Sequence, residues 1–134
     1  MQINWLAILV ALIAQQVLGF LWYSDMVLYE PWAAGTGLRS EELVLRAGPL
    51  ILATIAALLL PIGIAWVLHK TNLQGLKAGG LVGLGAGLLF IAPAVVSHES
   101  FLGYPPTVLA IDAGKEVVGA FLVGVILGGW RSES

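Results

Sequence analysis

The chain has 134 residues, of which 59% are hydrophobic and only 10% are charged, and its mean hydropathy is +0.95. A soluble protein of this size needs far more charge to cover its surface, so the composition predicts that a lipid bilayer is its main partner. The length suits one domain, residues 1–134. A net charge of −2 argues against nucleic acid as a partner, and the absence of Cys excludes disulfides, thiolate metal sites and Cys nucleophiles.

Four runs of the sequence are long and apolar enough to cross a bilayer as helices, which takes about 20 residues each. They cover residues 3–23, 47–68, 75–96 and 107–130. The five Trp and three Tyr residues fall near the ends of these runs, as expected for side chains that prefer the membrane interface. No basic region precedes the first run, so we expect a retained span and not a signal peptide. The sequence predicts an all-α integral membrane four-helix bundle with both termini on the same side.

The orientation of this bundle follows from its basic residues, because Lys and Arg favour the cytoplasmic side. Lys70, Lys77 and Arg131 fall on the side of the termini, and Arg39 and Arg46 fall on the opposite side. This distribution predicts cytoplasmic termini and a multi-pass protein of the plasma or inner membrane.

The connections and one proline give further local expectations. Glu30-Pro31-Trp32 and Gly35-Thr36-Gly37 are expected to interrupt any helix between the first two spans. The third connection is expected to run from residue 97 to 106 and to end in two prolines. Pro61 lies in the middle of the second span, where its missing N–H leaves the carbonyl of Ala57 without a helical partner.

Small residues recur at every fourth position in the third and fourth spans, in the manner of a glycine zipper. They are Gly75, Gly79, Gly83 and Gly87 in the third span, and Ala120, Gly124 and Gly128 in the fourth. Such a stripe lets two helix backbones approach closely. Two interpretations remain open: packing of the third span on its neighbour, or a seam between copies of the chain.

Asp112, Lys115 and Glu116 lie inside the last predicted span and fall within about 100° of one helix face. Charges at this depth are costly, so they must be paired, hydrated or functional. The spacing of Asp112 and Lys115 allows an ion pair, which would leave Glu116 without a cation. Gln15 and Gln16 of the first span reach about the same depth as Glu116, and Tyr23 shares the helix face of Gln16.

These six residues form a candidate polar cluster with three interpretations: contacts that hold the bundle or an oligomer together, a proton or ion pathway, or a site for a small ligand or a lipid headgroup. His98 and Glu99 are expected to form a solvated helix end. With two His and no Cys, neither a metal site nor a cofactor is expected. Because no Ser or His lies in a recognisable nucleophile pattern, we expect no enzymatic activity.

The chain also resembles a bacterial family, the domain of unknown function 1761. The residues that carry the resemblance are Asn4-Trp5-Leu6-Ala7, Gly19-Phe20-Leu21-Trp22-Tyr23-Ser24, Trp32, the Gly-rich third span, Tyr104, and Ile111-Asp112-Ala113-Gly114 followed by Gly124 and Gly128. Asp25 and Tyr29-Glu30-Pro31 depart from the family pattern and make the first connection more acidic. The resemblance implies a small four-span membrane protein and implies no activity.

Together, these observations favour a non-catalytic structural or accessory subunit that associates with itself or with another membrane protein. The alternative is a small transporter or a proton- or ion-conducting protein that uses Asp112 and Glu116.

Overall fold

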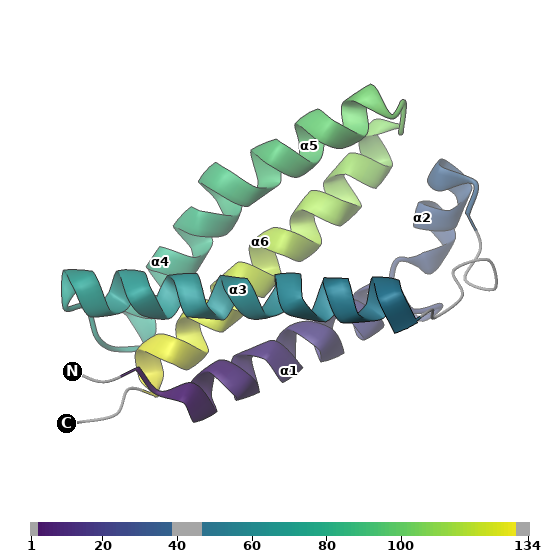
Figure 1. The fold of residues 1–134 in the computed structure, drawn as a ribbon. Helices are drawn as coiled ribbons and strands as arrows, with labels where there is room; N and C mark the ends of the chain where they lie inside the picture. The colour runs from purple at the N-terminus through teal and green to yellow at the C-terminus, as the bar shows by residue number, and fades with distance from the viewer. Residues whose placement is uncertain (1–2, 39–46, 131–134) are drawn as a thin grey trace.

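The computed structural model describes residues 3–38 and 47–130, and the described chain is all-α, as predicted (Figure 1). Its elements are α1 (Trp5–Trp22), α2 (Tyr29–Thr36), α3 (Ala47–Thr71), α4 (Leu76–Ala86), the π-helical turn η1 (Gly87–Ile91), α5 (Ala92–Phe101) and α6 (Pro106–Gly129). Because α4, η1 and α5 follow one another without a break, the described residues form five helices. Arg39, Arg46 and Arg131, which entered the orientation prediction, lie outside the described residues.

Three of the described helices are long and apolar enough to cross a membrane. They are α1 with 18 residues, α3 with 25 residues, and the continuous helix Leu76–Phe101 with 26 residues. The fourth long helix, α6, has 24 residues and carries three charged side chains in its first half. A crossing by α6 therefore stays a prediction.

The bundle is packed around α6, which contacts every other described helix. At one end, side chains of α1, α3 and α6 form a compact apolar core that contains Ala7, Ile8, Ala11, Ile64, Leu68, Val123 and Leu127. The described chain begins and ends here: the side-chain amide of Asn4 donates a hydrogen bond to the carbonyl oxygen of Trp130 at 3.2 Å, and Figure 1 shows both termini at this end. We call it the termini end.

The small residues of α4 face those of α6. A methyl group on Gly79 would overlap the carbonyl oxygen of Gly124, and one on Gly83 would overlap the carbonyl oxygen of Ala120. A methyl group on Gly87 would lie 2.8 Å from Cα of Val117, also on α6. The space beside these glycines is therefore filled by α6 of the same chain. This agrees with the interpretation that the third span packs on its neighbour. Just before α4, the N–H of Gly75 donates a hydrogen bond of 2.8 Å to the carbonyl oxygen of Gly128 on α6.

The continuous helix widens to π geometry just before Pro93. There the N–H of Ala92 bonds to the carbonyl oxygen of Gly87, five residues back. Since Pro93 has no N–H and its ring crowds the preceding turn, a wider turn here accommodates it without ending the helix. The helix then continues to Phe101, so the connection predicted for residues 97–106 is shorter than expected and Glu99 stands on a helix.

The connection after α1 also differs from the prediction. Glu30-Pro31-Trp32 and Gly35-Thr36-Gly37 were expected to interrupt a helix, yet α2 runs through most of both segments. Pro31 is tolerated because it lies in the first turn, where backbone N–H groups have no helical acceptor. The helix ends at Gly37, whose φ of 73° is the left-handed conformation common at helix C-termini.

At the end opposite the termini, α3 and α5 diverge (Figure 1). All of the first ten residues of α3, 47–56, are exposed, whereas Pro61, Ile64 and Leu68 farther along the same helix are buried. The second half of α3 is thus held by the core, and its first half stands apart from the bundle. This divergence opens the space in which the polar residues lie.

Candidate functional site: an acidic cleft

A cleft of about 820 Å³ opens between α1, α3, α5 and α6 at the end opposite the termini. Its lining includes the carboxyl groups of Glu99, Asp112 and Glu116, and Leu50 and Val95 contribute from the diverging helices α3 and α5. We call this space the acidic cleft. At the termini end, by contrast, a second cavity measures about 20 Å³, which is room for about one water molecule.

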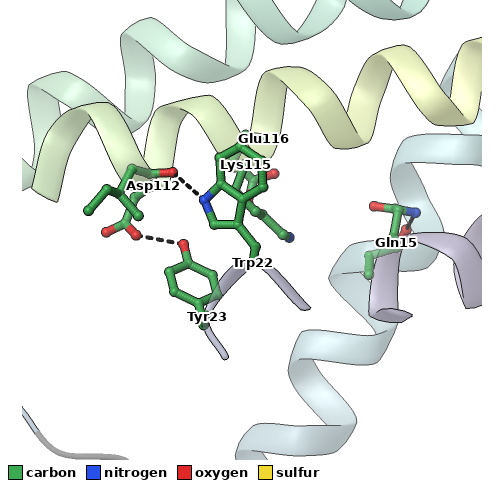
Figure 2. Close-up of polar contacts among 8 residues, drawn as sticks. Gln15, Trp22, Tyr23, Asp112, Lys115 and Glu116 are labelled. Atoms are coloured by element: carbon green, nitrogen blue, oxygen red, sulfur yellow. Dashed lines mark hydrogen bonds and ion pairs between the residues drawn. The ribbon is translucent and has the colours of Figure 1, made fainter. Parts of the chain in front are cut away.

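Asp112 is held in the cleft by the C-terminal end of α1. The hydroxyl of Tyr23 donates a hydrogen bond of 2.5 Å to Oδ1 of Asp112 (Figure 2). One residue earlier, the indole N–H of Trp22 donates to the carbonyl oxygen of Ile111 at 2.9 Å. Trp22, the last residue of α1, and Tyr23, its C-cap, therefore fix this turn of α6, and the structure brings Tyr23 and Asp112 together.

Lys115 pairs with Glu116, not with Asp112. The ammonium group of Lys115 lies 3.3 Å from Oε1 of Glu116, and both side chains are partly exposed. The expected Asp112–Lys115 pair, and the expectation that Glu116 lacks a cation, are therefore wrong. The lysine stem lies over Gly19, where a methyl group would be 3.5 Å from Cε of Lys115. Since this glycine lets the stem run along α1, the ammonium group reaches Glu116 while Asp112 turns to Tyr23.

Glu99 was predicted at a solvated helix end on the same side of the membrane as the polar cluster, but not as a member of that cluster. It lies in the last turn of its helix and lines the cleft, and its carboxyl group lies beside that of Asp112. Its Oε2 atom is shielded from solvent and accepts no hydrogen bond from the described residues. The helical spacing of Glu99 after Pro93 could have placed it in the cluster. It was not used, because residues 97–106 were predicted to be a connection and not a helix.

Gln15 does not join the cluster. Only 7% of this residue is exposed, and its side-chain N–H donates a 2.9 Å hydrogen bond to the carbonyl oxygen of Ala57 on α3, away from the acidic residues (Figure 2). That carbonyl is the group that Pro61 deprives of its helical partner. Gln16, the next residue, lines the cleft as expected for a member of the cluster.

Aromatic side chains form the wall of the cleft that comes from α1 and α2. Phe20, Tyr23, Tyr29 and Trp32 all belong to the lining. The rings of Tyr23 and Trp32 meet edge to face, with centroids 5.6 Å apart and planes at 67°. Phe20 is 81% exposed although it is fully apolar. The cleft thus combines an acidic wall with an aromatic one.

The Tyr23 hydroxyl is the centre of the acidic wall. Besides its bond to Asp112, it lies within electrostatic range of Glu116 and Glu99. The cleft lining contains four acidic residues, Asp25, Glu99, Asp112 and Glu116, and within the described residues Lys115 pairs with Glu116. A site of this composition attracts positive charge.

Fold and cleft together define an all-α protein with helices long and apolar enough to span a membrane and with an acidic cleft between them. The family described as "Protein of unknown function (DUF1761)" matches residues 6–128, so the chain belongs to this family, as the resemblance indicated. Neither a search of curated proteins nor a search of solved structures found a match.

Proposed function

We propose that this protein is a four-span membrane protein that binds cations in the acidic cleft and carries them across the membrane without catalysing a reaction. The proposal includes a crossing by α6 and a position in the plasma or inner membrane with cytoplasmic termini. The observation that carries it is the cleft itself, whose wall brings Glu99, Asp112 and Glu116 together on neighbouring helices.

The charge balance of the cleft supports cation binding. Of the four acidic residues in the lining, Glu116 has a lysine partner and Asp112 accepts from a neutral donor, the hydroxyl of Tyr23. Two carboxylates side by side, as Asp112 and Glu99 are, repel one another unless a proton or another cation lies between them. A bound cation would therefore stabilise the arrangement.

The distribution of space supports a carrier more than an open pore. The cleft lies at the end opposite the termini, whereas the termini end is filled by the apolar core around Ile8, Leu68 and Val123. A cation bound in the cleft could pass to the termini end only if the helices move. The second half of α3 packs in the core, whereas its first half is exposed. The first half is therefore the part of the bundle that can move most easily.

Reconstitution into liposomes tests the proposal. We expect the purified protein to take up at least one of four cations, namely protons, Na⁺, K⁺ or benzyltrimethylammonium, down an imposed gradient. Asp112→Asn should abolish this uptake, because it removes the charge while keeping the shape of the side chain. Glu30→Gln is the matched control, since Glu30 is exposed on α2 and does not line the cleft.

Uptake that is equal in Asp112→Asn and in the unmodified protein would contradict the proposal, as would the absence of uptake of all four cations. Folding of each variant is checked by circular dichroism and by elution in detergent, so that a misfolded protein is not read as an inactive one.

A second candidate function, an accessory or structural subunit, is supported by a different observation. Residues 47–56 of α3 are all exposed, and they form an apolar surface that another helix could cover. If this function holds, the protein should elute from mild detergent as a defined oligomer or complex, and Leu52→Trp on that surface should disrupt it. A monomer would contradict this candidate.

A further inference from the structure

We infer that the acidic cleft accepts an organic ammonium ion that carries an apolar or aromatic group. This inference rests on the proposed cation binding and narrows the class of cation. The juxtaposition that carries it is the presence of four acidic side chains, Asp25, Glu99, Asp112 and Glu116, beside aromatic rings within one open cleft.

The first step is the size of the cleft. Its volume of about 820 Å³ lies in the range of sites that take drug-sized organic molecules, roughly 300–1,000 Å³. A proton or a dehydrated alkali ion would leave nearly all of this space to water or lipid. An organic cation would fill it and make contacts with both walls.

The second step is the arrangement of the carboxyl groups. Within residues 3–38 and 47–130, no three Asp, Glu or His side chains are close enough together to hold a metal ion. Small inorganic cations need several oxygen atoms that converge at about 2.0–2.6 Å from one point. Carboxyl groups spread along two helices instead suit a larger cation, whose positive charge several of them can approach at once.

The third step is the aromatic wall. The face of an aromatic ring attracts a cation, and clusters of such rings are a recurrent way to bind ammonium groups. Phe20 is 81% exposed and has no polar atom, so its ring offers the cleft an apolar surface. Trp32 is fixed against Tyr23, which in turn holds Asp112. The rings are therefore positioned within reach of the negative charge.

The fourth step is the pair of carboxyl groups formed by Asp112 and Glu99, which lie side by side at the cleft. Two neighbouring carboxylates repel one another, and the positive charge of an ammonium ion bound next to them would reduce this repulsion.

The ammonium group has two possible sources: a free amine in water or the headgroup of a lipid such as phosphatidylcholine. Both share the chemistry that the cleft recognises. Calorimetry on the full chain in nanodiscs distinguishes them, with benzyltrimethylammonium as the probe and empty nanodiscs as the blank. If phosphatidylcholine nanodiscs weaken probe binding relative to nanodiscs of an uncharged glycolipid, the lipid headgroup occupies the cleft. Equal binding in both identifies the free amine.

We expect benzyltrimethylammonium to bind, and benzylsulfonate, of similar size and opposite charge, not to bind. Tetramethylammonium, which lacks the ring, should bind more weakly. Asp112→Asn and Glu99→Gln should each weaken the binding of benzyltrimethylammonium roughly tenfold or more, because each removes a charged partner. Phe20→Leu should weaken this binding about two- to fivefold, as expected for the loss of a partly exposed aromatic ring.

Two matched controls separate the site from general effects. Glu30→Gln removes a carboxylate outside the lining, and Phe90→Leu removes a ring that is 76% exposed on another helix. Neither variant should change the affinity for the probe.

The outcomes also separate this inference from the proposed function. One possible result is that Na⁺ or K⁺ binds, that Asp112→Asn abolishes this binding, and that the organic probe does not bind. The inferred class of ligand would then be wrong, but the proposed cation binding would hold. If no cation binds to the unmodified protein, both are wrong. Equal binding of benzyltrimethylammonium and benzylsulfonate, or equal binding by the unmodified protein and Asp112→Asn, would also overturn the inference.

Discussion

Gln15 and Pro61 form a compensating pair across two helices. Proline removes the N–H that would bond to the carbonyl oxygen of Ala57, and the amide of Gln15 donates to that oxygen from α1 at 2.9 Å. In a bilayer no water is available to replace such a bond, so the backbone must find its partner within the protein. The side chain of Gln15 thus stabilises α3. Its orientation is determined by the carbonyl group that Pro61 leaves without a helical partner.

We predict that Gln15→Leu lowers the free energy of unfolding by about 0.6–1.7 kcal/mol, from the average to the maximum found for polar contacts between membrane helices. Chemical denaturation in mixed micelles measures the change. Gln16→Leu, the same substitution one residue later in the exposed lining of the cleft, should leave the stability nearly unchanged.

A double-mutant cycle gives the control. In a Pro61→Ala background, residue 61 regains the N–H that can bond to Ala57, so Gln15→Leu should cost less than it does in the unmodified protein. An equal cost in both backgrounds would contradict the compensation.

The partners of the charged residues could not be predicted from the sequence. The helix face shared by Asp112, Lys115 and Glu116 follows from their spacing, but the choice of partner depends on what the neighbouring helix offers. Gly19 gives the lysine stem room, and Tyr23 offers a hydroxyl to Asp112. Both choices depend on the rotation and distance of α1 relative to α6, which residue spacing along one helix does not encode.

At the scale of elements, the contact between α4 and α6 joins backbone to backbone. Gly83 illustrates why the small residues are needed, since a methyl group there would overlap the carbonyl oxygen of Ala120. The four-residue period of the small residues predicted a close helix contact in advance. It could not decide between a contact within the chain and one between copies, because both require the same spacing.

We predict that Gly83→Ala destabilises the protein by about 1–3 kcal/mol, the usual cost of forcing an extra carbon into a packed contact. Gly85→Ala is the matched control: it lies in the same helix, and a methyl group there would meet nothing within 4 Å. Thermal unfolding in detergent should therefore show a lower Tm for Gly83→Ala alone. Equal effects of the two substitutions would contradict the packing described here.

The helix that carries Glu99 shows a further limit of the sequence. Polar residues and two prolines follow the apolar run and predict a connection over residues 97–106, yet the helix reaches Phe101. The wider turn before Pro93 lets it continue and directs its last part along α6. Such a turn depends on accommodation of the proline ring by its surroundings, so hydrophobic patterning gives no sign of it.

At the scale of the whole molecule, the number of membrane crossings decides where the termini lie. Three helices would place the termini on opposite sides of the membrane, whereas a crossing by α6 returns the chain to the side where it began. Asn4 and Trp130 meet through a hydrogen bond, which agrees with an even number. We predict that epitope tags at both termini are accessible from the cytoplasmic side alone, as measured by protease protection in right-side-out and inverted vesicles. Tags on opposite sides would contradict four crossings.

The most direct test asks whether the cleft is open to water and attracts cations. The chain has no Cys, so Phe20→Cys introduces a single reactive thiol into the cleft, and Leu59→Cys places one on an exposed apolar part of α3 as a control. The measurement is the rate at which the protein in liposomes reacts with methanethiosulfonate reagents that carry a trimethylammonium or a sulfonate group.

After correction for intrinsic reactivity, the cationic reagent should modify Phe20→Cys roughly tenfold faster or more than the anionic one, because the carboxylates concentrate positive charge in the cleft. Asp112→Asn should reduce this preference, and Leu59→Cys should react with neither reagent. An unreactive Phe20→Cys, or equal rates with the two reagents, would contradict an open, cation-attracting cleft.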